Sequence, residues 1–195
     1  MRNPMLVGER VYLRPVEPAD AEPLARMDAL EADTFMYRQR FPSSPLEHTH
    51  WIDEMYKEQP PGSIPFAVCA RDDDRLLGVV GVDGLDWLNR TGETFSFLGP
   101  ADIRGRGYGT EAKLLLLGYL FDQLHLHVIR SEVDGPNTRS AAALLKQGYR
   151  RAGTRKWVDV KNGRFYDQML FDLTRDDWRQ ADTRFHAQAG ASDHA

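Results

Sequence analysis

The stretch that decides the fold is Asp102–Ala112, "DIRGRGYGTEA", in which three glycines alternate with two arginines and a tyrosine. An unbroken run of leucines, residues 114–117, follows shortly after it. A glycine loop that leads into a helix exposes backbone N–H groups, and the helix dipole adds about half a positive charge at the same place. The stretch therefore predicts a binding site for an anion such as a phosphate group.

Two well-known phosphate-binding motifs can be compared with this stretch. The P-loop, GxxxxGK[ST], is excluded because no lysine follows Gly109. The dinucleotide pattern GxGxxA is met by Gly107, Gly109 and Ala112, with Asp134 at the end of a later expected strand. However, eight residues separate the preceding strand from Gly107, and the neighbouring elements are expected hairpins instead of βαβ units. A dinucleotide-binding protein is therefore a remote alternative.

Hydrophobic periodicity and turn residues predict a mixed α/β (α+β) fold. Seven strands are expected, over residues 11–16, 64–71, 75–83, 93–99, 126–134, 149–160 and 164–173. Helices are expected over residues 18–33, 43–59, 110–124 and 137–148. Hairpin-length turns separate many of the strands, so the sheet should be mostly antiparallel, with about four flanking helices. Residues 1–180 are expected to form one domain, and residues 181–195, which are small, polar and aperiodic, a disordered tail.

Composition excludes several classes of protein. The chain has 195 residues, 42% of them hydrophobic, and a formal net charge of −4, so it has enough apolar residues for one core and lacks an overall basic field for nucleic acid. No run approaches the ~20 apolar residues of a membrane span. The single cysteine, Cys69, lies in an apolar run and cannot form an internal disulfide, which suits a reducing compartment. A cytoplasmic protein without nucleic-acid or membrane partners is expected.

A third loop pattern, [QR]xxGx[GA], is met by Arg104, Gly107 and Gly109. With it the chain resembles the GCN5-related N-acetyltransferase (GNAT) family, in which this loop binds the pyrophosphate of acetyl-CoA. Over residues 6–173, the blocks "GERVYLRPVEPADAEPL", "RTGETFSFLGP", "VDGPNTRSAAALLKQGYRRAG" and "GRFYDQMLFDL" are similar to the RimJ/RimL-type branch. The resemblance implies central strands that splay apart, acetyl-CoA as co-substrate, and an amine acceptor that is a protein N-terminus or a small molecule. It also raises the option of a homodimer.

The resemblance assigns the cofactor to the glycine stretch and to two neighbouring elements. A turn role for the glycines and a helix N-cap role for Asn137 are the structural alternatives. A backbone N–H near Leu98 should stabilise the oxyanion that forms when an amine attacks the thioester. The expected cofactor-binding residues are Leu98, Arg104, Gly105, Arg106, Gly107, Tyr108, Gly109, Thr110, Asn137 and Ser140.

The chain departs from the wider family at the proton donor. Many members carry a tyrosine that protonates the leaving thiolate, but the matching stretch "ALLKQGY" has Leu144 at that position. The resemblance offers Ser140 as a substitute proton donor. The alternative is that Ser140 is a small packing residue in the first turn of its helix. Glu93 is the expected general base, acting through water, with an exposed surface charge as the alternative. The other carboxylate candidates are Asp83, Asp86 and Asp167.

Aromatic residues of the first two helices and their connection are expected to cap the acceptor pocket, although core packing would also explain them. The expected substrate-binding residues are Tyr37, Trp51 and Asp167. The histidines occur in pairs at i, i+2 spacing without a third ligand, so no metal site is expected at His48, His50, His125 or His127.

The sequence therefore predicts an N-acetyltransferase that moves an acetyl group from acetyl-CoA to an amine by direct attack, through a tetrahedral intermediate. Two alternatives stay open. Another acyl-CoA such as succinyl-CoA can be the donor, because nothing in the sequence sizes the acyl pocket. A non-catalytic CoA-sensing or CoA-binding module is the other alternative, and the missing tyrosine is its one indication.

Overall fold

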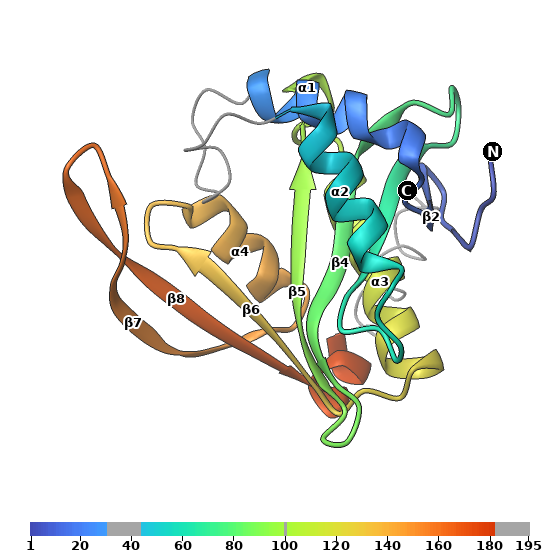
Figure 1. The fold of residues 1–195 in the computed structure, drawn as a ribbon. Helices are drawn as coiled ribbons and strands as arrows, with labels where there is room; N and C mark the ends of the chain where they lie inside the picture. Colours follow the sequence, from blue (N-terminus) through green and yellow to red (C-terminus); the bar gives the residue numbers. More distant parts are fainter. Residues whose placement is uncertain (31–43, 100, 182–195) are drawn as a thin grey trace, which may run out of the picture.

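The computed structural model describes residues 1–30, 44–99 and 101–181 (Figure 1). A mixed sheet runs through it in the order β1-β2-β3-β4-β5-β6-β8-β7. Neighbouring strands are antiparallel except β5 and β6, which are parallel. The strands are β1 (Leu6–Val7), β2 (Val11–Pro15), β3 (Ile64–Ala70), β4 (Leu76–Asp86), β5 (Thr91–Leu98), β6 (Val128–Asp134), β7 (Arg150–Lys161) and β8 (Arg164–Thr174).

The expected mixed, mostly antiparallel fold is confirmed, with eight strands where seven are expected. The additional strand, β1, has two residues, too few for a periodic pattern to be visible in the sequence. The α-helices are α1 (Ala21–Leu30), α2 (Pro45–Met55), α3 (Tyr108–Gly118) and α4 (Thr138–Lys146). Shorter helical turns are η1 (Pro18–Asp20), η3 (Ala101–Ile103) and the π-helical η4 (Tyr119–Gln123), and residues 175–181 are also helical.

Local chemistry explains where several elements begin and end. Ser44 caps α2, because its Oγ accepts the N–H of Glu47 at 3.3 Å, and a proline occupies the first helical position. Gly148 follows α4 at φ +98°, a conformation that ends helices and favours glycine. Asn162 and Gly163, both with positive φ, form the tight turn between β7 and β8.

Helices cover both faces of the sheet (Figure 1). One core cluster joins α3 and η4 to side chains such as Leu13 and Val68, and a second joins α1 and α2 to the opposite face of the same strands, with Tyr12 and Cys69. Burial raises the pKa of the Cys69 thiol, so this side chain is suited to packing and not to nucleophilic chemistry. No helix within the described ranges has the length and hydropathy that crossing a bilayer requires.

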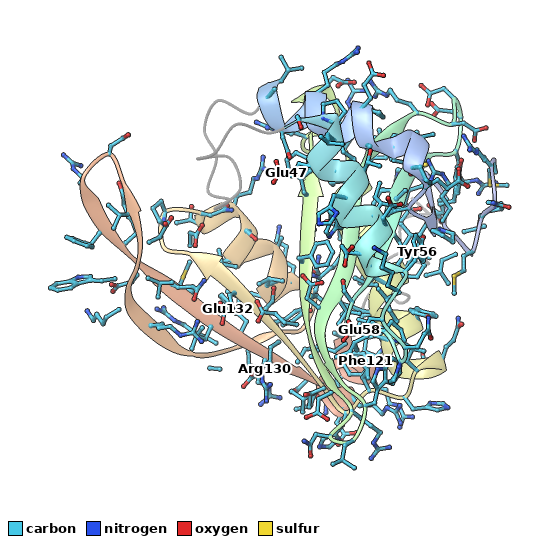
Figure 2. The ribbon with its side chains drawn as sticks, in the orientation of Figure 1. Glu47, Tyr56, Glu58, Phe121, Arg130 and Glu132 are labelled. Atoms are coloured by element: carbon cyan, nitrogen blue, oxygen red, sulfur yellow. The ribbon has the colours of Figure 1, made fainter. Side chains whose placement is uncertain are left out.

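The fork between β5 and β6 is the feature that positions the site. The two strands pair only over residues 91–93 and 128–130. Beyond this point β5 continues along β4 while β6 follows β8, and the strands diverge (Figure 1). Figure 2 shows Arg130 near the joined end of the fork and Glu132 further along β6, where the strands have parted. The expected splaying of the central strands is confirmed.

Three side chains hold the base of the fork. The Thr94 hydroxyl donates to the Arg130 carbonyl at 3.2 Å, and the Ser131 hydroxyl donates to the Thr94 carbonyl, also at 3.2 Å. The buried Tyr149 hydroxyl lies 2.8 Å from Thr94 Oγ1. These bonds occupy backbone acceptors that would otherwise be unpaired where the strands separate.

Candidate active site

A cavity of about 410 Å³ opens where the glycine stretch, β5 and α4 meet. It is lined by nine of the ten expected cofactor-binding residues, the exception being Arg106. The remaining lining residues are Ser96, Ile103, Lys113, Arg139, Ala143, Leu144 and Gln147. The tertiary structure thus brings three separate segments of the chain to one surface.

The glycine stretch forms an open turn in front of α3. Gly105 has φ +77° and Gly107 has φ +85°, in the left-handed region that favours glycine. Gly107 is the N-cap of α3 and offers no side chain to cap it, and the first intrahelical bond runs from the Glu111 N–H to the Gly107 carbonyl at 3.0 Å. The N–H groups of residues 108–110 precede that bond and therefore have no acceptor within the helix. They are the donors that an anion at this helix end would use.

Gly109 and Arg106, which also belong to the glycine stretch, lie differently relative to the cavity. A Cβ on Gly109 would lie 2.8 Å from Leu98 Cδ1, so glycine here lets α3 approach the end of β5. The Arg106 N–H donates to the Ile103 carbonyl at 3.3 Å, and the Arg106 side chain is exposed. Arg106 therefore has no free backbone donor for the cavity and does not line it.

A smaller cavity of about 180 Å³ lies inside the fork. It contains three carboxylates: Glu93 on β5, and Glu132 and Asp134 on β6. Glu132 is paired with Arg155 at 3.0 Å. The larger cavity carries two guanidinium groups, those of Arg104 and Arg139, and none of these carboxylates. The two cavities therefore differ in charge, since basic side chains line the larger one and acidic side chains the smaller one.

Of the four carboxylates expected as candidates for the base, Glu93 is the one that lines the smaller cavity. Side chains alternate along a strand, so Glu93 shares a face of β5 with Phe95 and Phe97, which pack against the cluster beneath α1 and α2. Burial raises the pKa of Glu93, and the charges of Glu132 and Asp83 raise it further. A carboxylate with a raised pKa is a stronger base than an exposed one.

The other expected carboxylates and Trp51 lie outside both cavities. Asp83 accepts a hydrogen bond from the Ser63 hydroxyl, and Asp86 accepts two from Asn89. Asp167 accepts the Trp157 N–H at 3.2 Å and pairs with Lys156 at 3.4 Å, so its contacts brace the β7–β8 hairpin. The ring of Trp51 packs edge-on against that of His48, with centroids 6.5 Å apart. Tyr37 lies outside the described residues.

The open edge of β5 offers backbone donors to the fork. The Gly99 N–H bonds to the Leu77 carbonyl on β4 at 3.1 Å, whereas the Thr94 carbonyl is bonded on the β6 side. Because backbone polar groups alternate in direction along a strand, the N–H groups of Ser96 and Leu98 point into the gap. Donors in such a position suit a developing oxyanion.

The start of α4 forms the opposite wall of both cavities. Asn137 is its N-cap, with Oδ1 accepting the Ser140 N–H at 3.1 Å, and both side chains also line the two cavities. The capping role and a ligand-binding role of Asn137 are thus compatible. Leu144, at the position where a tyrosine is common, is buried and lines both cavities, so this wall is apolar there.

Lys113 is one of the site residues that the sequence did not single out. It is 4% exposed and lines both cavities. Burial lowers its pKa to about 7, against the opposing effect of the Glu93 charge. The one available signal was a lysine within a helix that is otherwise apolar nearly all round, where a charged residue is unexpected.

Comparison with known proteins identifies the family of this chain. Residues 10–150 match the family model described as "Acetyltransferase (GNAT) domain". The chain belongs to the GNAT acetyltransferases. This membership makes it an acetyl-CoA-dependent N-acetyltransferase of amines. The described residues contain no cluster of three or more His, Cys, Asp or Glu side chains that could hold a metal ion.

Two relatives and one solved structure illustrate the range of the match. "Probable N-acetyltransferase YjcK" of Bacillus subtilis is 30% identical over 186 residues, which cover 89% of this chain and 99% of that protein. "Putative ribosomal N-acetyltransferase YdaF" of the same organism is 24% identical, with 88% and 95% covered, in agreement with the RimJ/RimL-type branch. The solved structure of Microcin C7 self immunity acetyltransferase MccE, in complex with acetyl-CoA and AMP, has the same fold, with a TM-score of 0.78, 20% identity, and 89% and 97% covered.

Proposed function

We propose that the diphosphate of acetyl-CoA binds at the first turn of α3 and that the thioester reaches the fork between β5 and β6. The observation that carries this proposal is the uncapped N-terminus of α3 at Gly107, whose free N–H groups face a cavity with two guanidinium groups. These residues fit a diphosphate, because helix N-termini and arginines are the donors that phosphate groups prefer. When bound, acetyl-CoA supplies the activated acetyl group.

The chain's own groups then act on an incoming amine. The Ser96 and Leu98 N–H groups stabilise the oxyanion as the amine nitrogen attacks the carbonyl carbon. Glu93 accepts the proton that this nitrogen loses, directly or through water. The acceptor enters beside the carboxylates of the smaller cavity, where a positively charged amine is attracted before it is deprotonated.

The cost of deprotonation favours an α-amine as acceptor. At pH 7, removing the proton from a lysine side chain with pKa ~10.4 costs roughly 4 to 5 kcal/mol, whereas an α-amine with pKa ~7.7 costs about 1 kcal/mol. A single partly buried carboxylate meets the smaller demand more easily. We therefore place protein or peptide N-termini first among the acceptors, and the name of YdaF supports this order.

The test is release of CoA thiol from acetyl-CoA across a panel of α-amino peptides, amino acids, polyamines and small primary amines. Turnover with at least one α-amine supports the proposal, and turnover with polyamines alone would refute the acceptor class. Succinyl-CoA is run in parallel, because a higher rate with this donor would replace acetyl as the transferred group. Tight CoA binding by calorimetry without turnover on any amine would indicate the CoA-sensing alternative.

Glu93→Gln tests the base. The substitution keeps the size of the side chain and removes its basicity, so the rate should fall and its dependence on pH should flatten, while CoA affinity stays unchanged. Asp86→Asn is the matched control, because Asp86 lies outside both cavities and its variant should retain the wild-type pH profile. An unaltered profile for Glu93→Gln would remove this residue from the mechanism.

Two remaining aspects of the proposal concern assembly and compartment. Light scattering of the purified protein tests the homodimer that the family resemblance suggests. The buried, unpaired Cys69 supports a reducing compartment such as the cytoplasm, which fractionation of cells that express the tagged protein would check.

A further inference from the structure

Five residues line both the larger cavity and the fork cavity: Ser96, Lys113, Asn137, Ser140 and Leu144. They mark the place where the two spaces meet. In the proposed function, the larger, basic cavity holds the diphosphate, and the smaller, acidic cavity in the fork receives the amine. The bond that breaks, between the carbonyl carbon and the sulfur of CoA, must then lie at this junction.

Lys113 is the one titratable side chain of this junction. It reaches the junction from α3, and its side chain is 4% exposed. Burying an ammonium group is costly, and its neighbours on α3, Ala112, Leu116 and Leu117, are fully buried apolar side chains. Packing alone would therefore be served better by an apolar residue at position 113.

Charged side chains also line the two cavities that Lys113 lines. Glu93 on β5 and Glu132 and Asp134 on β6 line the acidic cavity, and Arg104 before α3 and Arg139 on α4 line the basic one. Burial opposes the charged form of Lys113 and Glu93 favours it, with a resulting pKa of about 7. Lysine with this pKa is a mixture of ammonium and neutral amine at neutral pH, so it can both give and regain a proton.

We propose that Lys113 donates the proton that the leaving sulfur of CoA takes up, in the role that a tyrosine at position 144 would otherwise fill. The proposal rests on the proposed function. As the amine nitrogen forms its bond to the carbonyl carbon, the carbon–sulfur bond breaks and its electron pair goes to sulfur. Sulfur takes a proton from the Lys113 ammonium, and Glu93 holds the proton released by the amine. Transfer of that proton from Glu93 to the neutral Lys113 amine, through solvent, restores both groups, so no other reactant is needed.

Ser140 also lines the junction but is the weaker candidate. A serine hydroxyl is a much weaker acid than a thiol of pKa ~8.5, so it cannot supply a proton without receiving one. The Lys113 ammonium is a stronger acid than the thiol and can protonate the sulfur directly. Ser140 then orients the sulfur or passes the proton on.

The experiment uses three variants of the full chain. Lys113→Met roughly keeps the length of the side chain without its charge, and Lys113→Arg keeps the charge but donates protons poorly. Lys146→Met is the control. Lys146 is exposed in the last turn of α4 and lines neither cavity. The first measurement is the ionisation of the thiol of bound CoA, followed by thiolate absorbance against pH. The second is kcat against pH with acetyl-CoA and an amine that the wild type accepts.

An ammonium next to the sulfur lowers the pKa of the bound thiol. Lys113→Met should therefore raise this pKa by at least about one unit, a tenfold change in the ionisation constant. Lys113→Arg, whose guanidinium stays charged throughout the titration, should hold this pKa at or below the wild-type value, and Lys146→Met should leave it unchanged. Lys113→Met and Lys113→Arg should both lower kcat by about 100-fold or more. Both should lose the fall in rate above neutral pH that deprotonation of Lys113 causes in the wild type.

Each contrary result has a distinct meaning. An unchanged thiol pKa in Lys113→Met would place the side chain away from the sulfur and overturn the proposal. Wild-type kcat in Lys113→Arg would show that positive charge suffices and would overturn proton donation. If the wild type binds CoA but acetylates no amine in the panel, the proposed function fails, and the thiol titration still decides the position of Lys113. If the wild type binds no CoA, both proposals fall together.

Discussion

Replacement of Gly107 by valine separates the anion-binding role of the loop from its role in folding. Gly107 has φ +85°, where a β-branched residue costs about 1–3 kcal/mol. A Cβ at this position meets nothing closer than Arg10 Nη1 at 3.7 Å, so there is no clash to add to the strain. With a total stability of about 5–15 kcal/mol for a native domain, the Gly107→Val variant should fold, with a Tm lowered by about 2–12 °C.

The effect on CoA binding should be much larger. The valine methyl groups would cover the N–H groups at the start of α3, and each hydrogen bond from them to a phosphate oxygen contributes about 1.5–3 kcal/mol. Losing two such bonds corresponds to a loss of affinity of about 100-fold or more, which titration calorimetry with CoA measures directly.

Gly163→Val is the matched control for strain. Gly163 has φ +73° and open space around its Cβ position, and it lies in the β7–β8 turn, away from both cavities. This variant should show a similar drop in Tm and unchanged CoA affinity. If Gly107→Val binds CoA within about threefold of wild type, a difference below 1 kcal/mol, the first turn of α3 does not hold the diphosphate.

Three further outcomes concern stability. Tyr149→Phe removes the 2.8 Å hydrogen bond to Thr94 at the base of the fork. This variant should lower the free energy of unfolding in urea by about 0.5–1.5 kcal/mol. An unchanged free energy of unfolding would mean that this bond does not hold the fork. In the wild type, the Arg14 guanidinium makes two 2.7 Å bonds to the Asp20 carboxylate in a buried pair. Arg14→Met leaves this carboxylate without a counter-charge and should cost about 3–5 kcal/mol. The Arg14→Met/Asp20→Leu double variant should recover part of that loss, and no recovery would contradict the desolvation argument. The pKa of Lys113 is lowered to about 7, so above this pH the unfolded chain binds more protons than the folded one. Stability should therefore rise with pH up to the ordinary lysine pKa of ~10.4. Lys113→Met should lose this rise in thermal unfolding curves, and an equal slope of stability against pH in both proteins would contradict the burial of the charge.

Much of the fold and of the glycine loop was predictable because it depends on local backbone chemistry. Gly105 and Gly107 adopt positive φ, which glycine permits at little cost, and Gly107 stands at the start of the expected helix. The capping by Ser44 and Asn137 and the Asn162–Gly163 turn follow from the same kind of preference.

Other residues near the site could not be assigned from local pattern. Arg106 lies within the glycine stretch, yet its N–H bonds to Ile103 and it does not line the cavity. Asp167 and Trp51 have residue types suited to an acceptor pocket, but their contacts lie in the β7–β8 hairpin and beneath α1 and α2. Which way a side chain points depends on neighbours that are distant in the sequence.

The sequence by itself determined the order of elements, the glycine turn before α3 and the family, because these depend on residue types at short spacing. Only the tertiary structure decided which charges face one another. It set Glu93 on the acidic side of the fork and buried Lys113 where the two cavities meet. Burial and the field of distant charges control how tightly an acid or base holds its proton, and both arise only when β5, β6, α3 and α4 have packed together.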